Sequence, residues 1–299
     1  MLNKVLLTIC TLFILQFAEA QQLEPREELV EINGTKLFVQ VMGKGDPLVL
    51  VHGGPGLNHT YLEPWLENLA SKYTLIFYDQ RGMGASQIAV SDSMRTATFV
   101  RDLEGLREYL GIEQLYLMAH SFGCFTGYSY ICNYPDRVKA ALLVSPVPFN
   151  NRFDKEMQAA MEDAMTEEDR TFIDSLRASQ GFAERDLETV VSMLKFSANL
   201  AKCDPRTEQE FFIELPENYF AASISYKGWR TRYNEPMDCK LIETEVPITV
   251  LHGQCDVIPL AATQEIPIMA DIVVFEESGH YSFMEQPKAF KKLVRKTFR

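Results

Sequence analysis

Strand-like and helix-like segments alternate along the first half of the chain. Polar and apolar positions alternate on both sides of Asn33-Gly34, which predicts a β-hairpin over residues 28–43. Apolar positions recur every three or four residues over 96–111, as in an amphipathic helix that ends at Gly111. Continuous apolar runs typical of buried strands occupy residues 46–54, 74–82, 114–121 and 138–146. This alternation predicts an α/β fold, a mostly parallel sheet with helices on both faces.

The alternation stops near Pro148. Residues 148–240 are polar and helical in pattern, with runs such as KEMQAAMEDAMTEEDRTFIDSL. Strand-like runs then return at VPITVLHGQCD and DIVVFEES, and a last helix begins near Gln286. A separate domain is the alternative, but both ends of the block return to the same rhythm of strands. We therefore expect residues 148–240 to form a helical cap on one core, made of residues 21–147 and 241–299.

The first twenty residues have the pattern of a secretory signal peptide. Lys4 precedes an apolar run of about 13 residues, and Ala18-Glu19-Ala20 supplies the small residues of a cleavage site. A membrane anchor is the alternative, but the run is shorter than the ~20 residues that a spanning helix needs. The sequence predicts cleavage after Ala20 and a secreted or periplasmic protein, with no membrane segment after cleavage.

Composition narrows the classes of partner. The chain has 299 residues, 46% of them hydrophobic, and a formal net charge of −12. An acidic chain of this kind disfavours a nucleic-acid partner. Neither a metal-ligand cluster nor a nucleotide-binding loop is recognisable, so we expect no metal and no cofactor.

Five cysteines remain after the predicted cleavage, an odd number. Cys124 and Cys132, if they share a helix, would lie about 12 Å apart, too far for a bridge. Cys203 and Cys239 could pair, but nothing in the sequence requires it. We expect buried free thiols.

Three residues with complementary chemistry follow three of the predicted strands. Ser121 follows LYLMA, Asp256 follows ITVLHGQC and His280 follows IVVFEESG. Reactive groups in an open parallel sheet gather at the carboxyl ends of strands. A serine nucleophile needs a base, and the base needs an orienting carboxylate. Each residue alone is more often structural, but three strand ends in the order Ser, Asp, His predict a catalytic triad.

The other four histidines fit structural roles better. His120 adjoins Ser121 on a sharp elbow, where neighbours point in different directions. His52 and His252 look like hydrogen-bonding residues at a turn and in a strand. His59 begins a helix and has no partner that the sequence identifies.

Acyl transfer also needs donors for a developing oxyanion. HGGPG, His52–Gly56, is a turn with little side-chain bulk after a buried strand. We expect backbone N–H groups of this turn, with that of Phe122 after the serine, to face the substrate.

These motifs carry a family resemblance. HGGPG, YDQRGMGAS, AHSFG, HGQCD and SGH resemble the α/β-hydrolase fold family, and specifically its proline iminopeptidase (prolyl aminopeptidase) branch. The resemblance implies Ser121 as nucleophile, Asp256 as acid and His280 as base, with Gly54 and Phe122 as oxyanion donors. It also implies structural roles for Asp79 and Arg81 in the turn DQRG.

The serine elbow departs from that branch, which has a GGSWG-like motif. Here the motif is AHSFG, with differences at Ala119, His120 and Phe122. Alanine adds one methyl group at a crowded position, so we expect the elbow to form. The departure bears on peptidase specificity.

A cap segment carries the expected contacts with a substrate amine. FFIELPENYF, Phe211–Phe220, resembles an ENHYF-type segment of the branch and aligns Glu217 with its glutamate, with Glu214 one helical turn earlier. These acids would bind a protonated N-terminus, and the aromatic residues around them would line a pocket for an apolar ring. The alternative is that both acids belong to a solvated face of an acid-rich cap.

Three functions remain open at this point. The first is an exported serine aminopeptidase that removes an N-terminal residue, such as proline, from a small peptide. The second is an esterase or lactonase for a small acyl substrate with the same triad. The third is a catalytically silent binding protein, which the intact triad disfavours. The serine excludes the aspartate nucleophile of epoxide hydrolases and haloalkane dehalogenases.

Overall fold

The computed structural model describes residues 23–89, 93–204, 211, 215, 219, 245–266 and 269–299. Three sequence predictions fall outside these residues: the signal peptide of residues 1–20, the acids Glu214 and Glu217, and any bond of Cys239.

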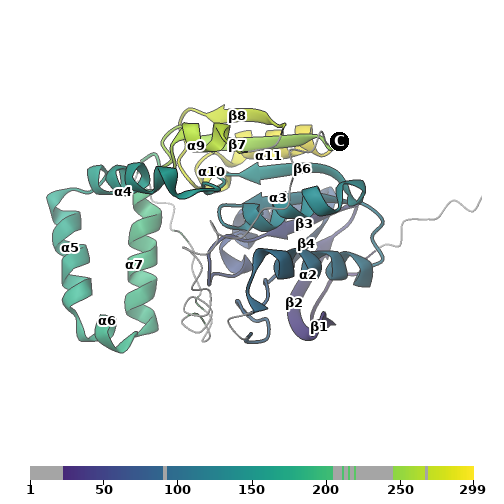
Figure 1. Cartoon of the computed structure of the whole chain (residues 1–299), viewed down its shortest axis with the longest axis horizontal. Helices are drawn as coiled ribbons and strands as arrows, with labels where there is room; N and C mark the ends of the chain where they lie inside the picture. The colour runs from purple at the N-terminus through teal and green to yellow at the C-terminus, as the bar shows by residue number, and fades with distance from the viewer. Residues whose placement is uncertain are drawn as a thin grey trace, which may run out of the picture.

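One mixed sheet forms the centre of the fold (Figure 1). Its strands are β1 (Arg26–Ile32), β2 (Thr35–Gly43), β3 (Asp46–Val51), β4 (Tyr73–Tyr78), β5 (Leu115–His120), β6 (Val138–Val144), β7 (Ile248–Gly253) and β8 (Asp271–Phe275). Their order in the sheet is β1-β2-β4-β3-β5-β6-β7-β8. β1 pairs antiparallel with β2 and β2 with β4, whereas the neighbours from β4 to β8 are parallel. The mostly parallel sheet that the sequence predicts is confirmed.

The β1–β2 hairpin is also confirmed. Asn33 and Gly34 form its turn with φ values of 50° and 71°. A two-residue turn with positive φ at both positions matches the right-handed twist of the strands that it joins.

Helices cover both faces of the sheet. The α-helices are α1 (Glu63–Leu66), α2 (Thr96–Tyr109), α3 (Gly123–Asn133), α4 (Asp154–Asp163), α5 (Glu167–Ala178), α6 (Gln180–Glu184), α7 (Leu187–Leu200), α9 (Leu260–Gln264), α10 (Ser282–Glu285) and α11 (Pro287–Thr297). Short 3-10 helices are η1 (His59–Tyr61), η2 (Glu67–Ser71), η4 (Pro135–Arg137) and η5 (Asn151–Phe153).

Two apolar cores lie on opposite faces of the sheet. Val49 and Val51 of β3 pack in a core with α2 and α3, whereas Leu48 and Leu50 pack in a core with α1 and α11. Successive side chains of a strand point to opposite faces, so a strand covered on both sides is a continuous apolar run. This explains the continuous apolar runs in the sequence, and the end of each run marks the end of a strand.

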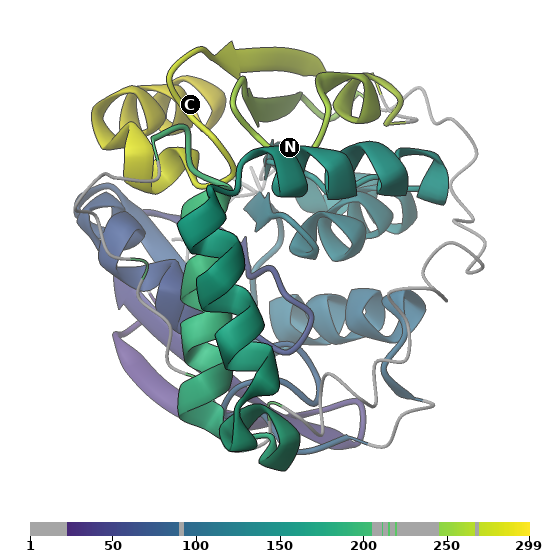
Figure 2. The same ribbon diagram turned by 90° about the vertical axis from the view of Figure 1, so that its left-hand side faces the viewer.

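Helices α4 to α7 follow β6 and precede β7 in the chain. Figure 1 shows α5 and α7 side by side at one end of the sheet, and Figure 2 views the pair from that end, with the two helices overlapping. Their starts follow from capping: Thr166 and Asp169 form a capping box at α5, and Asp186 caps α7. The limits 148–240 of a cap remain a prediction. Among the described residues, no helix is long and apolar enough to cross a bilayer.

The expectation of free thiols is wrong for Cys203 and Cys255. These two form a disulfide with their Cα atoms 4.9 Å apart, so Cys203 does not pair with Cys239. Cys132 is disulfide-bonded as well, and Cys124 is a buried free thiol. Cys203 and Cys255 are 52 residues apart, and they meet because the chain after α7 packs beside the loop after β7. Sequence spacing alone does not report such a contact.

Candidate active site

Ser121 occupies a strained turn between β5 and α3. Its φ is 53°, in the left-handed region, and its N–H donates to the carbonyl of Val144 at 2.9 Å. A serine in this region costs of order 1–3 kcal/mol, which persists only where the surrounding structure fixes it. Here two buried elements meet at the residue, and the turn has the form of a nucleophile elbow.

Space for Ala119 comes from the helix that follows it. A Cβ atom added to Gly127 of α3 would lie 2.9 Å from the Cβ of Ala119. At the start of the same helix, a Cβ atom on Gly123 would lie 2.4 Å from the carbonyl oxygen of His52. Two helix glycines therefore let α3 approach β5 and β3 closely. The extra methyl group of AHSFG fits because position 127 has no side chain.

The structure brings Ser121, His280 and Asp256 together. Nε2 of His280 lies 2.9 Å from Oγ of Ser121, and Nδ1 lies 2.9 Å and 3.2 Å from the two carboxylate oxygens of Asp256. Since the carboxylate only accepts, Nδ1 carries the proton and Nε2 accepts from the hydroxyl. The Asp256 side chain is fully buried, and its Oδ1 also accepts from the N–H of Ile258 at 3.0 Å. This arrangement can take the Ser121 proton.

Contacts that the sequence did not reveal hold the loops of His280 and Asp256. The N–H of His280 donates to the carbonyl of Ala201 at 2.8 Å. Glu285 accepts from the N–H groups of Gly279 at 2.8 Å and Cys203 at 2.6 Å. With the Cys203–Cys255 disulfide, these bonds tie the chain after α7 to both loops. An acid five residues after a predicted base carries no signal that would have identified Glu285.

The HGGPG turn lies against Ser121. A Cβ atom on Gly53 would be 2.8 Å from the hydroxyl of Tyr61 and 3.1 Å from the Cβ of Ser121, so a side chain there would crowd both residues. Gly54 follows with φ 137°, a conformation that favours glycine. Phe122 is the N-cap residue of α3, directly after Ser121. The predicted oxyanion donors Gly54 and Phe122 therefore belong to two segments that meet at the serine.

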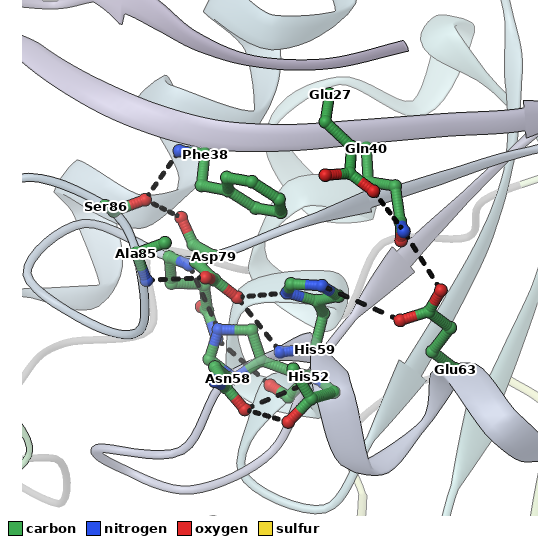
Figure 3. Close-up of polar contacts among 12 residues, drawn as sticks. Glu27, Phe38, Gln40, His52, Asn58, His59, Glu63, Asp79, Ala85 and Ser86 are labelled. Atoms are coloured by element: carbon green, nitrogen blue, oxygen red, sulfur yellow. Dashed lines mark hydrogen bonds and ion pairs between the residues drawn. The ribbon is translucent and has the colours of Figure 1, made fainter. Parts of the chain in front are cut away.

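A buried acid joins the HGGPG side of the site to the DQRG turn (Figure 3). Asp79, which is 0% exposed, accepts from N and Nδ1 of His59 at 2.9 and 2.8 Å and from the N–H of Ala85 at 2.8 Å. The sequence did not identify this partner of His59. Asp79 has the structural role that the resemblance implies.

Hydrogen bonding and charge shift the pKa values of His59 and Asp79 in opposite directions. Burial alone would lower the pKa of His59, but the hydrogen bond and charge of Asp79, with the charges of Glu63 and Glu27, outweigh it and raise that pKa. Burial alone would raise the pKa of Asp79, but the hydrogen bond and charge of His59 outweigh it and lower that pKa. Each shift favours the charged form of its group, so His59 and Asp79 stabilise one another's charge.

Arg81 has the second structural role. Its Nε and Nη2 donate to the two oxygens of Asp102 at 2.8 and 2.7 Å, and Nη2 also donates to the carbonyl of Asn33 at 3.1 Å. This buried bidentate pair fastens the DQRG turn to α2 and to the β1–β2 turn.

His52 and His252 form structural hydrogen bonds, as the sequence predicts. Nε2 of His52 accepts from the N–H of Gln80 at 3.0 Å, and Nδ1 of His252 lies 3.0 Å from Oγ1 of Thr263. Burial lowers the pKa of both histidines. His120 is bonded to Tyr61 and to the backbone of His280.

Of the aromatic residues in the cap segment, Phe211 and Tyr219 lie in the described part. The Phe211 ring is buried, with its centroid 4.5 Å from that of Tyr281 and 5.5 Å from that of Tyr61. Tyr281 follows His280 directly, so Phe211 brings its segment close to the site. Burial raises the pKa of Tyr219. In the described ranges, no three His, Cys, Asp or Glu residues are placed to hold a metal ion.

Comparison with known proteins identifies the family. The sequence profile of the alpha/beta hydrolase fold matches residues 46–287. A proline iminopeptidase of Lactobacillus helveticus (strain DPC 4571) is 28% identical over 284 residues, which cover 88% of this chain and 94% of that protein.

Solved structures share the fold. A proline iminopeptidase-related protein from Thermus thermophilus matches with a TM-score of 0.64 and 22% identity, over 92% of this chain and 97% of that one. Est816, described as an N-acyl homoserine lactone degrading enzyme, matches with a TM-score of 0.62 and 21% identity, over 90% and 99%. The chain belongs to the α/β-hydrolase fold family and is distantly related to proline iminopeptidases.

Proposed function

We propose that this protein is a serine hydrolase in which Ser121 is the nucleophile, His280 the general base and Asp256 the acid that orients it. The hydrogen-bonded series Ser121 Oγ–His280 Nε2 and His280 Nδ1–Asp256 carries the proposal. A base at hydrogen-bonding distance from a strained, buried serine is the geometry that activates a hydroxyl.

The reaction then proceeds in two halves. Ser121 Oγ attacks the substrate carbonyl while its proton passes to Nε2 of His280, and the N–H groups of Gly54 and Phe122 bind the oxyanion. His280 returns that proton to the leaving group as its bond to the acyl carbon breaks, which leaves an acyl-enzyme. A water molecule then attacks the acyl carbon and gives a proton to Nε2 of His280. His280 passes that proton to Oγ of Ser121 as the bond between Oγ and the acyl carbon breaks, which releases the acid and restores the serine. The carboxylate of Asp256 accepts from Nδ1 of His280 throughout and stabilises the imidazolium.

For specificity, we propose an aminopeptidase of the proline iminopeptidase type. The distant relatives of that name and the motif resemblance support it. In this proposal Glu217, and secondly Glu214, binds the protonated N-terminus of a small peptide. An esterase or lactonase is the alternative, and the structural match to Est816 rests on the fold alone.

A fluorophosphonate probe tests the chemistry. Wild-type protein should be labelled on Ser121, and Ser121→Ala or His280→Ala should lose roughly 10³-fold or more of kcat. Ser145→Ala is the matched control, because Ser145 also has positive φ at a strand end and its hydroxyl has no hydrogen-bond partner among the described residues. Wild-type protein that ignores the probe, or an active Ser121→Ala protein, would exclude the serine mechanism.

The proposed binding of the substrate amine by Glu217 is tested by comparing two substrates. Glu217→Gln should cripple cleavage of a proline arylamide and spare hydrolysis of a short-chain aryl ester, because only the first presents a charged amine beside the scissile bond. Glu188→Gln, an exposed acid on α7, serves as the control. Equal losses on both substrates, or none on either, would favour the esterase.

We also propose that the protein is exported after cleavage at Ala20. The Cys203–Cys255 disulfide supports this, because such bonds persist mainly in oxidising compartments. Mass spectrometry of the secreted or periplasmic protein should find Gln21 at its N-terminus. An intact Met1 in the membrane fraction would identify an anchor instead.

A further inference from the structure

A chain of three hydrogen bonds runs behind Ser121. The N–H of Gly53 lies 2.6 Å from the hydroxyl of Tyr61, and that hydroxyl lies 2.7 Å from Nδ1 of His120. Nε2 of His120 lies 3.0 Å from the carbonyl oxygen of His280. The chain therefore joins the HGGPG turn to the backbone of the proposed base.

Every proton in this chain has a defined place. The carbonyl of His280 only accepts, so Nε2 of His120 carries a proton and donates. Burial lowers the pKa of His120 well below its usual range, so the ring is neutral and Nδ1 accepts. The Tyr61 hydroxyl must then donate to Nδ1 and accept from Gly53. None of these groups can exchange its donor and acceptor roles, so the hydrogen bonds all run in one direction, from Gly53 to the carbonyl of His280.

The surroundings keep this chain dry and rigid. Tyr61 and His120 are each 2% exposed. The ring of Phe283 packs edge-on to His120 with centroids 5.1 Å apart, and Phe211 packs on Tyr61 at 5.5 Å. Water cannot replace a lost partner here, so a change to one member leaves its neighbour without a hydrogen bond.

Both ends of this series of hydrogen bonds lie next to the reacting serine. A Cβ atom added to Gly53 would lie 3.1 Å from the Cβ of Ser121, and Gly53 precedes the proposed oxyanion donor Gly54. His280, at the other end, faces Ser121 Oγ at 2.9 Å. We propose that Tyr61 and His120 are positioning residues, which set the oxyanion turn and the base at fixed places about Ser121. This inference rests on the proposed serine mechanism and is independent of substrate class.

Three substitutions separate the links of the chain. Tyr61→Phe removes the hydroxyl and keeps the ring. His120→Asn keeps an acceptor near the place of Nδ1 and removes the bond to His280. His120→Gln keeps a donor near the place of Nε2 and removes the acceptor for Tyr61. Tyr78→Phe is the matched control, because Tyr78 is also buried and its hydroxyl has no partner among the described residues.

The readout is kcat on an aryl ester per active site, counted by fluorophosphonate titration, with KM and urea unfolding measured alongside. We expect both His120 variants to lose about tenfold in kcat, the equivalent of one buried hydrogen bond, with KM changed less. Tyr61→Phe, which breaks two hydrogen bonds, should lose at least as much. The double variant Tyr61→Phe/His120→Gln should lose no more than the worse single variant, since both break the same link. Tyr78→Phe should keep the wild-type kcat.

The outcomes are distinguishable. Variants that unfold at lower urea yet keep wild-type kcat per titrated site would show a merely structural role and overturn the positioning proposal alone. Additive losses in the double variant would show that Tyr61 and His120 do not act through one series of hydrogen bonds, and would overturn the proposal. Wild-type protein that does not react with the probe would overturn the serine mechanism and this inference together.

Discussion

Asp79 offers a direct test of how the site is fastened. Its carboxylate accepts three hydrogen bonds, two from His59 and one from Ala85, at full burial. Asp79→Asn keeps the shape but replaces one acceptor oxygen with an NH₂ group. Whichever way the amide turns, that group meets an N–H donor of His59 or Ala85. At least one buried donor loses its acceptor, and the His59 ring, where it is protonated, loses its counter-ion.

The expected cost follows from those two losses. A buried unsatisfied donor costs about 1–3 kcal/mol, and breaking a buried ion pair costs about 3–5 kcal/mol. The effects overlap, so we expect Asp79→Asn to lower the free energy of unfolding by about 3–5 kcal/mol. Asp46→Asn is the control, because Asp46 forms an exposed ion pair with Lys139 and should lose no more than about 1 kcal/mol.

The cost should depend on pH with a definite sign. The raised pKa of His59 stabilises the fold below its unfolded value of 6.5, and this contribution is lost as the pH rises through the folded pKa. The lowered pKa of Asp79 stabilises the fold above its unfolded value of 3.8, and this is lost as the pH falls through the folded pKa. The difference between wild type and Asp79→Asn should therefore be largest between 3.8 and 6.5.

Urea unfolding across this pH range measures the difference. The reasoning fails if Asp79→Asn costs no more than Asp46→Asn, or if its cost is the same at every pH. A loss of kcat without a loss of stability would also contradict it, because Asp79 contacts the turns and not the reacting atoms.

Three further predictions concern the packing of the site. Gly127→Ala should lower the free energy of unfolding by about 1–3 kcal/mol, because the new methyl group would lie 2.9 Å from the Cβ of Ala119. Adding Ala119→Gly should recover most of this loss in calorimetry. If it recovers none, the contact with Ala119 is not the cause. Glu285→Gln should lower the free energy of unfolding by about 1.5–3 kcal/mol, since it weakens charge-assisted bonds to two backbone N–H groups, and a neutral effect in urea would contradict this. Cys255→Ser removes a link across 52 residues, worth about 4 kcal/mol by loop entropy. The urea midpoints of wild type and variant should therefore differ without reductant and coincide when both are measured in reductant.

Local pattern was enough to predict the strands and the place of the serine. The continuous apolar runs mark strands covered on both faces, so their ends could be read from the sequence. Ser121, Asp256 and His280 follow three such ends, and the structure brings their side chains within hydrogen-bonding distance. Motif and topology together therefore predicted that these three side chains meet.

Contacts between distant segments could not be predicted in this way. Ala201 and Cys203 meet the loops of the site and Glu285 only because the chain after α7 returns to the sheet. Their partners are mostly backbone N–H and carbonyl groups, which every residue has. The pairing of His59 with Asp79 was missed for a similar reason, because the DQRG turn meets the start of η1 only in the folded chain.

The departure of AHSFG from the GGSWG pattern has a coherent physical explanation. A glycine before the nucleophile has no side chain to accept from Tyr61 or to donate to the carbonyl of His280. His120 does both, so in this chain a side chain links the HGGPG turn to the base. The added bulk at Ala119 is matched by the absence of a side chain at Gly127. Each change at the elbow thus has a partner elsewhere in the fold. The departure from GGSWG therefore leaves the elbow intact, with Oγ of Ser121 2.9 Å from Nε2 of His280.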